Sequence, residues 1–105
     1  MDKPVVNEAV LNLGEVPCAP FALPGTTDLA DSIVPYLQGH AAVLLANHGT
    51  VTWGESMERA YFRLETLEYY AKMLILTGLG PKAHLLNEEE KKGIESRRQR
   101  YGIVF

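Results

Sequence analysis

Residues 41–53 read AAVLLANHGTVTW, and this stretch decides the fold. Its first six residues form a short apolar run flanked by polar ones, which predicts a strand buried on both faces. Asn47 and Gly49 suit a tight turn, since Gly49 accepts a positive φ and Asn47 tolerates one. The β-formers that follow, up to Trp53, favour a second strand pairing back antiparallel. The sequence therefore predicts a hairpin that presents His48 at its turn.

A long amphipathic helix is expected after the hairpin, over residues 55–77. An acid and a base four residues apart, Glu68 and Lys72, favour a helix there. Gly78 should end the helix, and Pro81 should prevent its continuation. The apolar positions that recur at helical spacing are Met57, Ala60, Tyr61, Leu64, Leu67, Ala71, Leu74 and Ile75.

Three further segments precede the hairpin. Alternation of apolar and polar residues over Val5–Leu13 predicts a strand. The prolines of residues 17–24 favour a loop or a sheet edge, because proline cannot donate to a sheet ladder. Residues 26–37 are expected to form a helix that begins at the capping residues Thr26-Thr27-Asp28 and ends or kinks at Pro35.

The C-terminal part predicts a second, mostly polar helix over residues 87–100. Asn87 and Glu90 form a variant of the capping box. Glutamates gather at the expected start of this helix and arginines at its end, which suits the helix dipole. Gly102 should end it. Its apolar stripe is thin, so a surface position is expected.

Composition narrows the class of protein. The chain has 105 residues, 47% hydrophobic and 22% charged, which suits one small globular domain. A net charge of −3 gives no indication of a basic surface that would bind nucleic acid. No apolar run approaches the roughly 20 residues that span a bilayer. No secretory signal is expected, because residues 1–4 contain no basic segment that leads into an apolar core. The single cysteine, Cys18, excludes a disulfide within the chain. A cytoplasmic location is the expectation.

His48 is the strongest candidate for chemistry. An imidazole at the end of a buried strand could bind a metal or transfer a proton. The alternative is a turn histidine bonded to backbone. A zinc site needs three or four ligands, and no pair among His40, His48, His84 and Cys18 has compact ligand spacing. His40 and His84 are interpreted as surface histidines, and Cys18 as a packing residue.

Tyr101 is the second candidate. It follows the basic end of the last predicted helix and precedes Gly102. Its phenol could serve as a proton donor in a catalytic site, or its ring could anchor the tail by packing. No glycine-rich phosphate loop and no nucleophilic serine motif is present in the sequence.

Several segments, taken in order, resemble the class II aldolase/adducin family, in particular its L-fuculose-phosphate aldolases. The resemblance runs from about Val5 to the end of the chain, and the ordered set is far more specific than any one segment. The segments are VPCAPF (16–21), PGTTDLA (24–30), LLANHG (44–49), the helix 60–77 and Tyr101-Gly102.

The resemblance implies an α/β fold, namely a layered α/β/α arrangement with a largely antiparallel sheet, of which residues 1–105 would be the C-terminal half. It implies a cyclic homotetramer with active sites between subunits, zinc as the cofactor and a sugar phosphate as the substrate. His48 matches the third zinc-binding histidine, and Tyr101 matches a tyrosine that acts at the substrate hydroxyl. The family's His-x-His pair, glutamate base and phosphate loops lie before the segment that corresponds to Met1.

Two hypotheses of function follow from the resemblance. In the first, the chain is part of a zinc aldolase that cleaves a ketose 1-phosphate, completed by another polypeptide that supplies the N-terminal half. In the second, it is a non-catalytic, adducin-like assembly module or an inactive truncated fragment. On either hypothesis this chain alone is expected to be inactive, because one imidazole cannot hold zinc tightly. It is also expected to associate, with itself or with a complementary half, because strand edges and apolar faces should be exposed.

Overall fold

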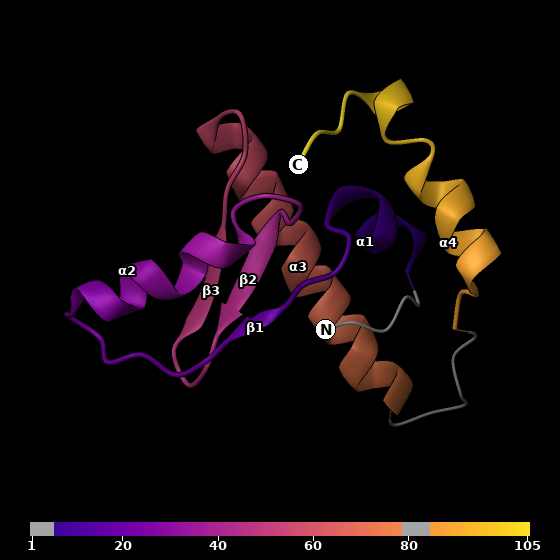
Figure 1. The fold of residues 1–105 in the computed structure, drawn as a ribbon. Helices are drawn as coiled ribbons and strands as arrows, with labels where there is room; N and C mark the ends of the chain where they lie inside the picture. The colour runs from indigo at the N-terminus through magenta and orange to yellow at the C-terminus, as the bar shows by residue number, and fades with distance from the viewer. Residues whose placement is uncertain (1–5, 79–84) are drawn as a thin grey trace.

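The computed structural model describes residues 6–78 and 85–105. It shows a mixed α/β fold in which a small sheet lies between helices (Figure 1). The elements in chain order are α1 (Asn7–Asn12), β1 (Cys18–Ala19), α2 (Thr27–Ile33), η1 (Val34–Tyr36), β2 (Ala42–Leu45), β3 (Gly49–Thr52), α3 (Met57–Gly78), α4 (Glu88–Glu95) and η2 (Gln99–Tyr101), where η marks a 3₁₀ helix.

The sheet has three strands in the order β1-β2-β3. β2 and β3 pair antiparallel, with Leu45 opposite Gly49, so the predicted hairpin is confirmed. The positive φ at its turn falls on Asn47, at 59°, and not on Gly49. β1 pairs with β2 in parallel over two residues, Cys18 and Ala19, so the proline-rich segment supplies a short edge strand. The sheet is therefore mixed within the residues that the structure describes.

Side chains of β2 alternate between two apolar clusters on opposite faces of the sheet, because successive strand residues point to opposite sides. Ala42 packs with α1 and α3, in a cluster that includes Leu13 and Leu67. Val43 packs in a second cluster, against Leu29 and other residues of α2 and η1. The prediction of a strand buried on both faces is confirmed, and β2 is the most buried element of the sheet.

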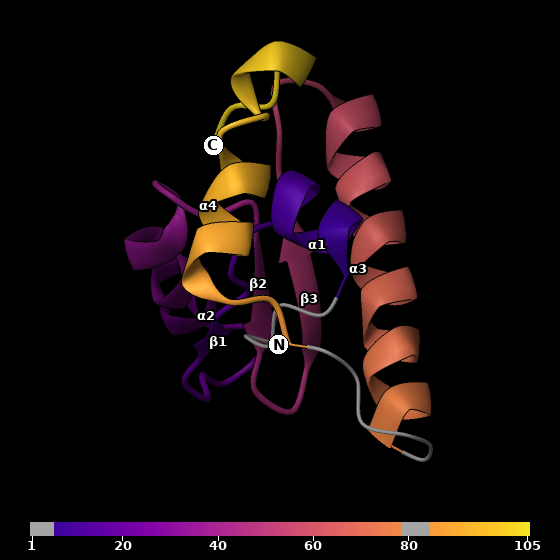
Figure 2. The same cartoon turned by 90° about the vertical axis from the view of Figure 1, so that its right-hand side faces the viewer.

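The predicted strand over Val5–Leu13 is wrong. Asn7–Asn12 form α1, with Val6 as its N-cap, and α1 lies between α4 and α3 in the view of Figure 2. Val6, Ala9, Val10 and Leu13 recur at intervals of three, four and seven, which is the spacing of one helical face. Both periodicities were present in the sequence, and packing of Ala9 and Leu13 against α3 selected the helical one.

The other predicted helices are present, although α2 and α4 are shorter than predicted. α2 ends at Ile33 and gives way to the 3₁₀ turn that contains Pro35, as the proline rule requires. α3 ends at Gly78, and Pro81 and His84 lie outside the described residues. α4 begins with the capping box of Asn87 and Glu90, both halves of which are formed. It ends earlier than predicted, and η2 follows as a separate turn.

Candidate functional site

The hairpin turn presents His48 to solvent. Its backbone N–H donates to the carbonyl of Leu45 at 3.0 Å, which fixes the turn on the buried strand. No hydrogen bond or ion pair joins its imidazole to any residue within 6–78 or 85–105. The alternative of a turn histidine whose ring bonds to backbone therefore does not hold within the described residues. Both ring nitrogens are open to a ligand.

A complete metal site is not formed by the described part of this chain. No group of three or more His, Cys, Asp or Glu side chains comes together there. His48 therefore contributes one ligand where zinc needs three or four. The residues present do not by themselves fit a bound zinc ion.

The structure corrects the predictions for two other side chains. His40 was expected on the surface, but it is half-buried and packs edge-on against Tyr36, with ring centroids 5.9 Å apart. Its carbonyl accepts from Nε1 of Trp53 at 3.1 Å, and its own Nδ1 is buried without a partner among the described residues. Cys18 was expected to pack, but it is exposed on the edge strand β1. Neither residue joins His48 in a cluster.

Tyr101 is the last residue of η2 and is 61% exposed. Gly102 follows in the left-handed conformation, with φ 67°, and turns the chain back towards the body of the molecule. The η2 turn, yellow in Figures 1 and 2, lies at the opposite end of the molecule from the turn between β2 and β3. The chain therefore presents its two candidate residues at separate places and does not unite them in one site.

Two arginines hold the tail that carries Tyr101. Arg98 donates from Nη2 to the carbonyl of Val10 at 2.7 Å and from Nε to that of Leu11 at 3.1 Å. Arg63, which is only 3% exposed, donates to the carbonyl of Trp53 at 2.6 Å and to that of Val104 at 2.8 Å.

The ring of Phe105 lies near both guanidinium groups. Its centroid is 4.5 Å from Cζ of Arg98 and 5.3 Å from Cζ of Arg63, within cation–π range. Gly14, with φ 68°, makes room for this arrangement, because a Cβ there would come 3.2 Å from Nη2 of Arg98. The last residues of the chain are thus fixed by contacts with α1 and α3.

Burial lowers the pKa of both arginines, and for Arg63 the charge of Arg59 lowers it further while Glu55 opposes the shift. For Arg98 the carboxylate of Glu95 opposes the lowering of the pKa. An arginine remains charged at neutral pH despite such shifts. Their charge therefore strengthens the hydrogen bonds that hold the tail.

The role of the arginines was missed in the sequence. A signal did exist for Arg63, which shares a helical face with Leu67 and Tyr70, both buried. An arginine in an apolar stripe indicates that its guanidinium group donates hydrogen bonds to buried acceptors. No such pattern marks Arg98, since its partners lie 87 and 88 residues earlier in the chain.

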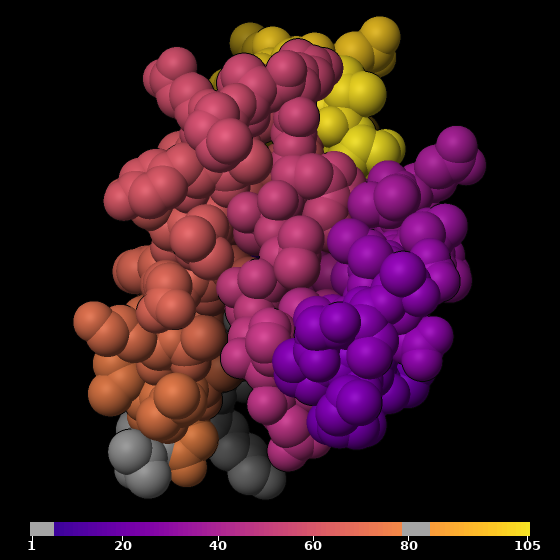
Figure 3. Space-filling view, turned by 90° about the vertical axis from the view of Figure 1, so that its left-hand side faces the viewer, coloured from indigo at the N-terminus to yellow at the C-terminus, as the bar shows by residue number. Residues whose placement is uncertain are grey.

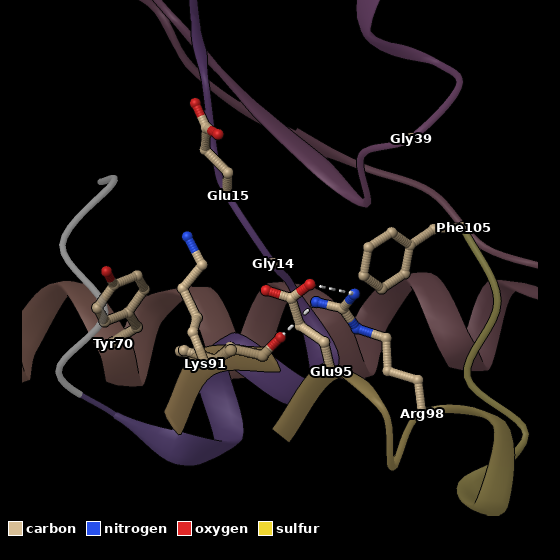
Figure 4. A pocket seen from close by; sticks show the side chains of 10 residues that line it. Gly14, Glu15, Gly39, Tyr70, Lys91, Glu95, Arg98 and Phe105 are labelled. Carbon is tan, nitrogen blue, oxygen red and sulfur yellow. Dashed lines mark hydrogen bonds and ion pairs between the residues drawn. The ribbon is translucent and has the colours of Figure 1, made fainter. Parts of the chain in front are cut away.

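A cavity of about 450 Å³ lies between α1, α3, α4 and the tail (Figure 4). Its lining includes the side chains of Glu15, Tyr70, Lys91, Glu95 and Arg98. The ion pair between Arg98 and Glu95, at 3.9 Å, closes part of its wall. His48 and Tyr101 are not among the lining residues, so this cavity is separate from both candidate residues.

Comparison with known proteins shows the family to which this chain is related. Residues 2–75 match the family described as Class II Aldolase and Adducin N-terminal domain. The chain belongs to the class II aldolase and adducin family. The resemblance that the sequence suggested is thereby confirmed.

Individual members of the family give the comparison detail. The chain is 35% identical over 83 residues to 3-oxo-tetronate 4-phosphate decarboxylase of Escherichia coli K12, covering 79% of this chain and 39% of that protein. It is 29% identical over 96 residues to L-fuculose phosphate aldolase of Haemophilus influenzae, covering 90% and 44%. A solved L-fuculose 1-phosphate aldolase structure superposes with a TM-score of 0.80 at 29% identity, covering 91% and 46%. The chain thus spans less than half the length of each of these relatives.

Among residues 6–78 and 85–105 of this chain, no helix is both long and apolar enough to cross a membrane.

Proposed function

We propose that this chain is the C-terminal half of a zinc-dependent class II aldolase of the L-fuculose-phosphate type. The complete enzyme cleaves a ketose 1-phosphate into dihydroxyacetone phosphate and an aldehyde, in the cytoplasm and as a homotetramer. The proposal includes a layered α/β/α fold with a largely antiparallel sheet, to which the described strands contribute a part. The family match and the relatives named as aldolases support it.

One observation carries the proposal, namely the exposed imidazole of His48 on a rigid hairpin. β2 is buried on both faces, and the hydrogen bond from His48 to Leu45 ties the turn to it. A ligand fixed in this way loses little conformational freedom when it binds a metal. An imidazole with no internal partner is also free to bind through either nitrogen.

The remaining parts of the site come from outside this chain. Zinc bound by His48 and by further ligands would supply Lewis-acid stabilisation of the negative charge that develops as the carbon–carbon bond breaks. The exposed position of His48 allows a second polypeptide, or the preceding half of the same domain, to approach it. Within this chain, the task of His48 is to bind and orient.

Tyr101 is proposed to hold or donate a proton at the substrate hydroxyl. The η2 turn lies at the far end of the molecule from the hairpin (Figure 1), so one active site would take His48 from one subunit and Tyr101 from another. This arrangement agrees with active sites between the subunits of a homo-oligomer. The arginine contacts of the tail would then serve to hold Tyr101 at the subunit boundary.

A second candidate reaction is decarboxylation of a 3-oxo acid phosphate. It is favoured by the relative named 3-oxo-tetronate 4-phosphate decarboxylase, at 35% identity. Aldol cleavage and this decarboxylation both leave an electron pair on the carbon next to a carbonyl group, so the same charge stabilisation serves both. A third possibility is the non-catalytic, adducin-like assembly module or inactive fragment.

The test begins with zinc content. The purified chain is dialysed against a weak chelator, and zinc per chain is measured by elemental analysis, alone and with a polypeptide supplying the preceding half. The proposal expects about one zinc per assembled site, lost in His48→Ala and retained in the matched control His84→Ala. Cleavage of L-fuculose 1-phosphate and release of CO₂ from 3-oxo-tetronate 4-phosphate are then assayed on the same samples.

Each outcome is informative. Zinc with aldol cleavage supports the aldolase, and zinc with CO₂ release supports the decarboxylase. Zinc retained in His48→Ala would contradict the role of His48 as a ligand. Absence of zinc and of both activities in the assembled protein would leave the non-catalytic module.

A further inference from the structure

Residues 98–105 form a loop whose two ends meet at one guanidinium group. That group belongs to Arg98 and lies between the carboxylate of Glu95 and the ring of Phe105 (Figure 4). Its Nη1 is 3.9 Å from Oε2 of Glu95, and its Cζ is 4.5 Å from the centroid of the Phe105 ring. Tyr101 lies near the middle of this loop. Displacing the guanidinium group should therefore shift the segment that carries the phenol.

The main chain of Arg98 is bonded directly to that of Tyr101. The carbonyl oxygen of Arg98 accepts from the N–H of Tyr101 at 3.0 Å and from the N–H of Ile103 at 2.9 Å. Ile103 is buried, whereas Tyr101 is exposed. The loop therefore directs its apolar side chain into the molecule and its phenol outward, and one carbonyl oxygen holds both residues in this arrangement.

The side chain of Arg98 attaches the loop to α1. It donates to the carbonyls of Val10 and Leu11, which lie in the last turn of that helix. Carbonyls in the last turn have no partner within their own helix, so the guanidinium group satisfies acceptors that the helix leaves open. Ala9 and Val10 of α1 are buried. The position of Tyr101 is thus fixed relative to a packed part of the molecule.

Two residues from earlier elements support the same loop. The C-terminal residues, yellow in Figure 3, lie at one end of the molecule, where the carbonyl of Val104 accepts from Arg63 of α3. A Cβ at Gly14 would come 3.2 Å from Nη2 of Arg98 and 3.3 Å from the ring of Phe105, so a larger residue would press on the base of the loop. The base of the loop is therefore closely packed on the side of α1 as well as on that of α3.

We propose that Arg98 is a positioning residue for Tyr101, which it holds by its carbonyl while its side chain is anchored on α1. The inference rests on the proposed function, in which Tyr101 holds or donates a proton at the substrate hydroxyl. Proton transfer needs heavy atoms about 2.6–3.2 Å apart, and a misplacement of about 1 Å can lower a rate a hundredfold. Arg98 rather than Arg63 has this role, because the N–H of Tyr101 donates to Arg98 itself.

A positioning role affects the two kinetic constants differently. A proton donor that has lost its place stabilises the transition state less, while the rest of the substrate is still bound by other groups. The expected signature is a lower kcat at a nearly unchanged KM. A residue that only stabilises the fold would instead reduce the amount of folded protein and leave the kcat of the folded fraction unchanged.

The test uses the 105-residue chain assembled with a polypeptide that supplies the preceding half, assayed with both candidate substrates. Arg98→Met is expected to lower kcat at least about tenfold and to keep KM within about threefold. Gly14→Ala, which disturbs the same loop from α1, should lower kcat in the same direction. The matched control is Ile33→Ala, a packing change on the opposite face of the sheet, which should lower stability and leave kcat within about twofold.

A double-mutant cycle shows whether Arg98 acts through the phenol. In a Tyr101→Phe background, Arg98→Met is expected to lower kcat by less than about twofold, because the group that it positions is already gone. The same loss in both backgrounds would overturn the proposal. A loss confined to KM, or an equal loss of kcat in Ile33→Ala, would also overturn it.

A measurement on the 105-residue chain separates this inference from the proposed function. With fluorotyrosine in place of Tyr101, the transverse relaxation of the fluorine signal is expected to slow at least about twofold in Arg98→Met, because the loop gains motion, and to stay unchanged in Ile33→Ala. Inactivity of the original assembled protein would contradict the proposed function alone. Unchanged relaxation in Arg98→Met would overturn the positioning role, whatever the activity.

Discussion

The β2–β3 hairpin and the C-terminal tail both present an exposed candidate side chain, yet they are held in place by different means. The hairpin that carries His48 is built from neighbours in sequence, since Leu45 and Gly49 pair across the turn. The tail that carries Tyr101 depends on Arg63 and Arg98, which donate to carbonyls 41 to 88 residues away. Local contacts therefore fix one candidate residue, and long-range contacts fix the other.

This difference predicts that the tail can be released while the hairpin stays intact. The largest effect is expected from Arg63→Met. The change removes two charge-assisted hydrogen bonds from a buried site and leaves the carbonyls of Trp53 and Val104 without a donor. We expect a loss of about 3 kcal/mol in the free energy of unfolding, measured by urea denaturation. The exposed Arg97→Met is the matched control, and a loss below about 1 kcal/mol would show that the tail does not rely on Arg63.

The next effect is expected from Arg98→Met. It removes the donors to Val10 and Leu11 and the cation–π contact with Phe105, and it should cost about 2 kcal/mol, since this site is only partly buried. Amide hydrogen exchange is expected to become faster in residues 99–105 and to stay unchanged in β2 and β3. Faster exchange in the hairpin would contradict the independence of the two regions. Arg100→Met serves as the control.

A smaller effect is expected at the hairpin turn. Asn47 adopts φ 59°, a conformation that alanine disfavours by about 1 kcal/mol. Asn47→Ala should therefore lower the free energy of unfolding by that amount, while Asn47→Gly should lie within about 0.5 kcal/mol of the original chain. Thermal unfolding followed by circular dichroism measures both. Equal losses in the two variants would mean that the asparagine side chain matters, rather than its backbone conformation.

The smallest effect on stability is expected for His48→Ala. The imidazole is exposed and has no partner in residues 6–78 or 85–105, so its removal should change the free energy of unfolding by less than about 0.5 kcal/mol. A stable variant makes the zinc measurement proposed above clean, because loss of metal could then not be attributed to unfolding. A loss above about 1 kcal/mol in metal-free protein would reveal a structural role for this side chain.

Sequence patterns predicted the centre of the molecule well. The apolar run of residues 41–46 gave the buried strand, and the 3.6-residue period of residues 55–77 gave α3. The capping box of Asn87 and Glu90 located the start of α4. The position of His48 at an exposed turn also followed from local residues alone. These predictions succeeded because periodicity and capping depend on residues that are close together in the sequence.

Tertiary structure decided what local patterns left open. The segment after Val5 carries both a two-residue and a helical period, and contact of Leu13 with the α1–α3 cluster made it a helix. His40 was expected to be exposed and is half-buried, whereas Cys18 was expected to pack and is exposed. Neither environment can be predicted from the neighbouring residues in the sequence, because one depends on packing beside Trp53 and the other on the position of β1 at the sheet edge.

By itself, then, the sequence determined the hairpin, the long helix, the family and the two candidate residues, His48 and Tyr101, because each depends on neighbouring residues or on motifs kept in order along the chain. Only the tertiary structure decided that the two residues lie at opposite ends of the molecule and that Arg63 and Arg98 hold the tail. The physical reason is that the guanidinium groups donate to backbone carbonyls, which every residue has. The pattern of side chains in the sequence therefore does not indicate which carbonyls an arginine will bind.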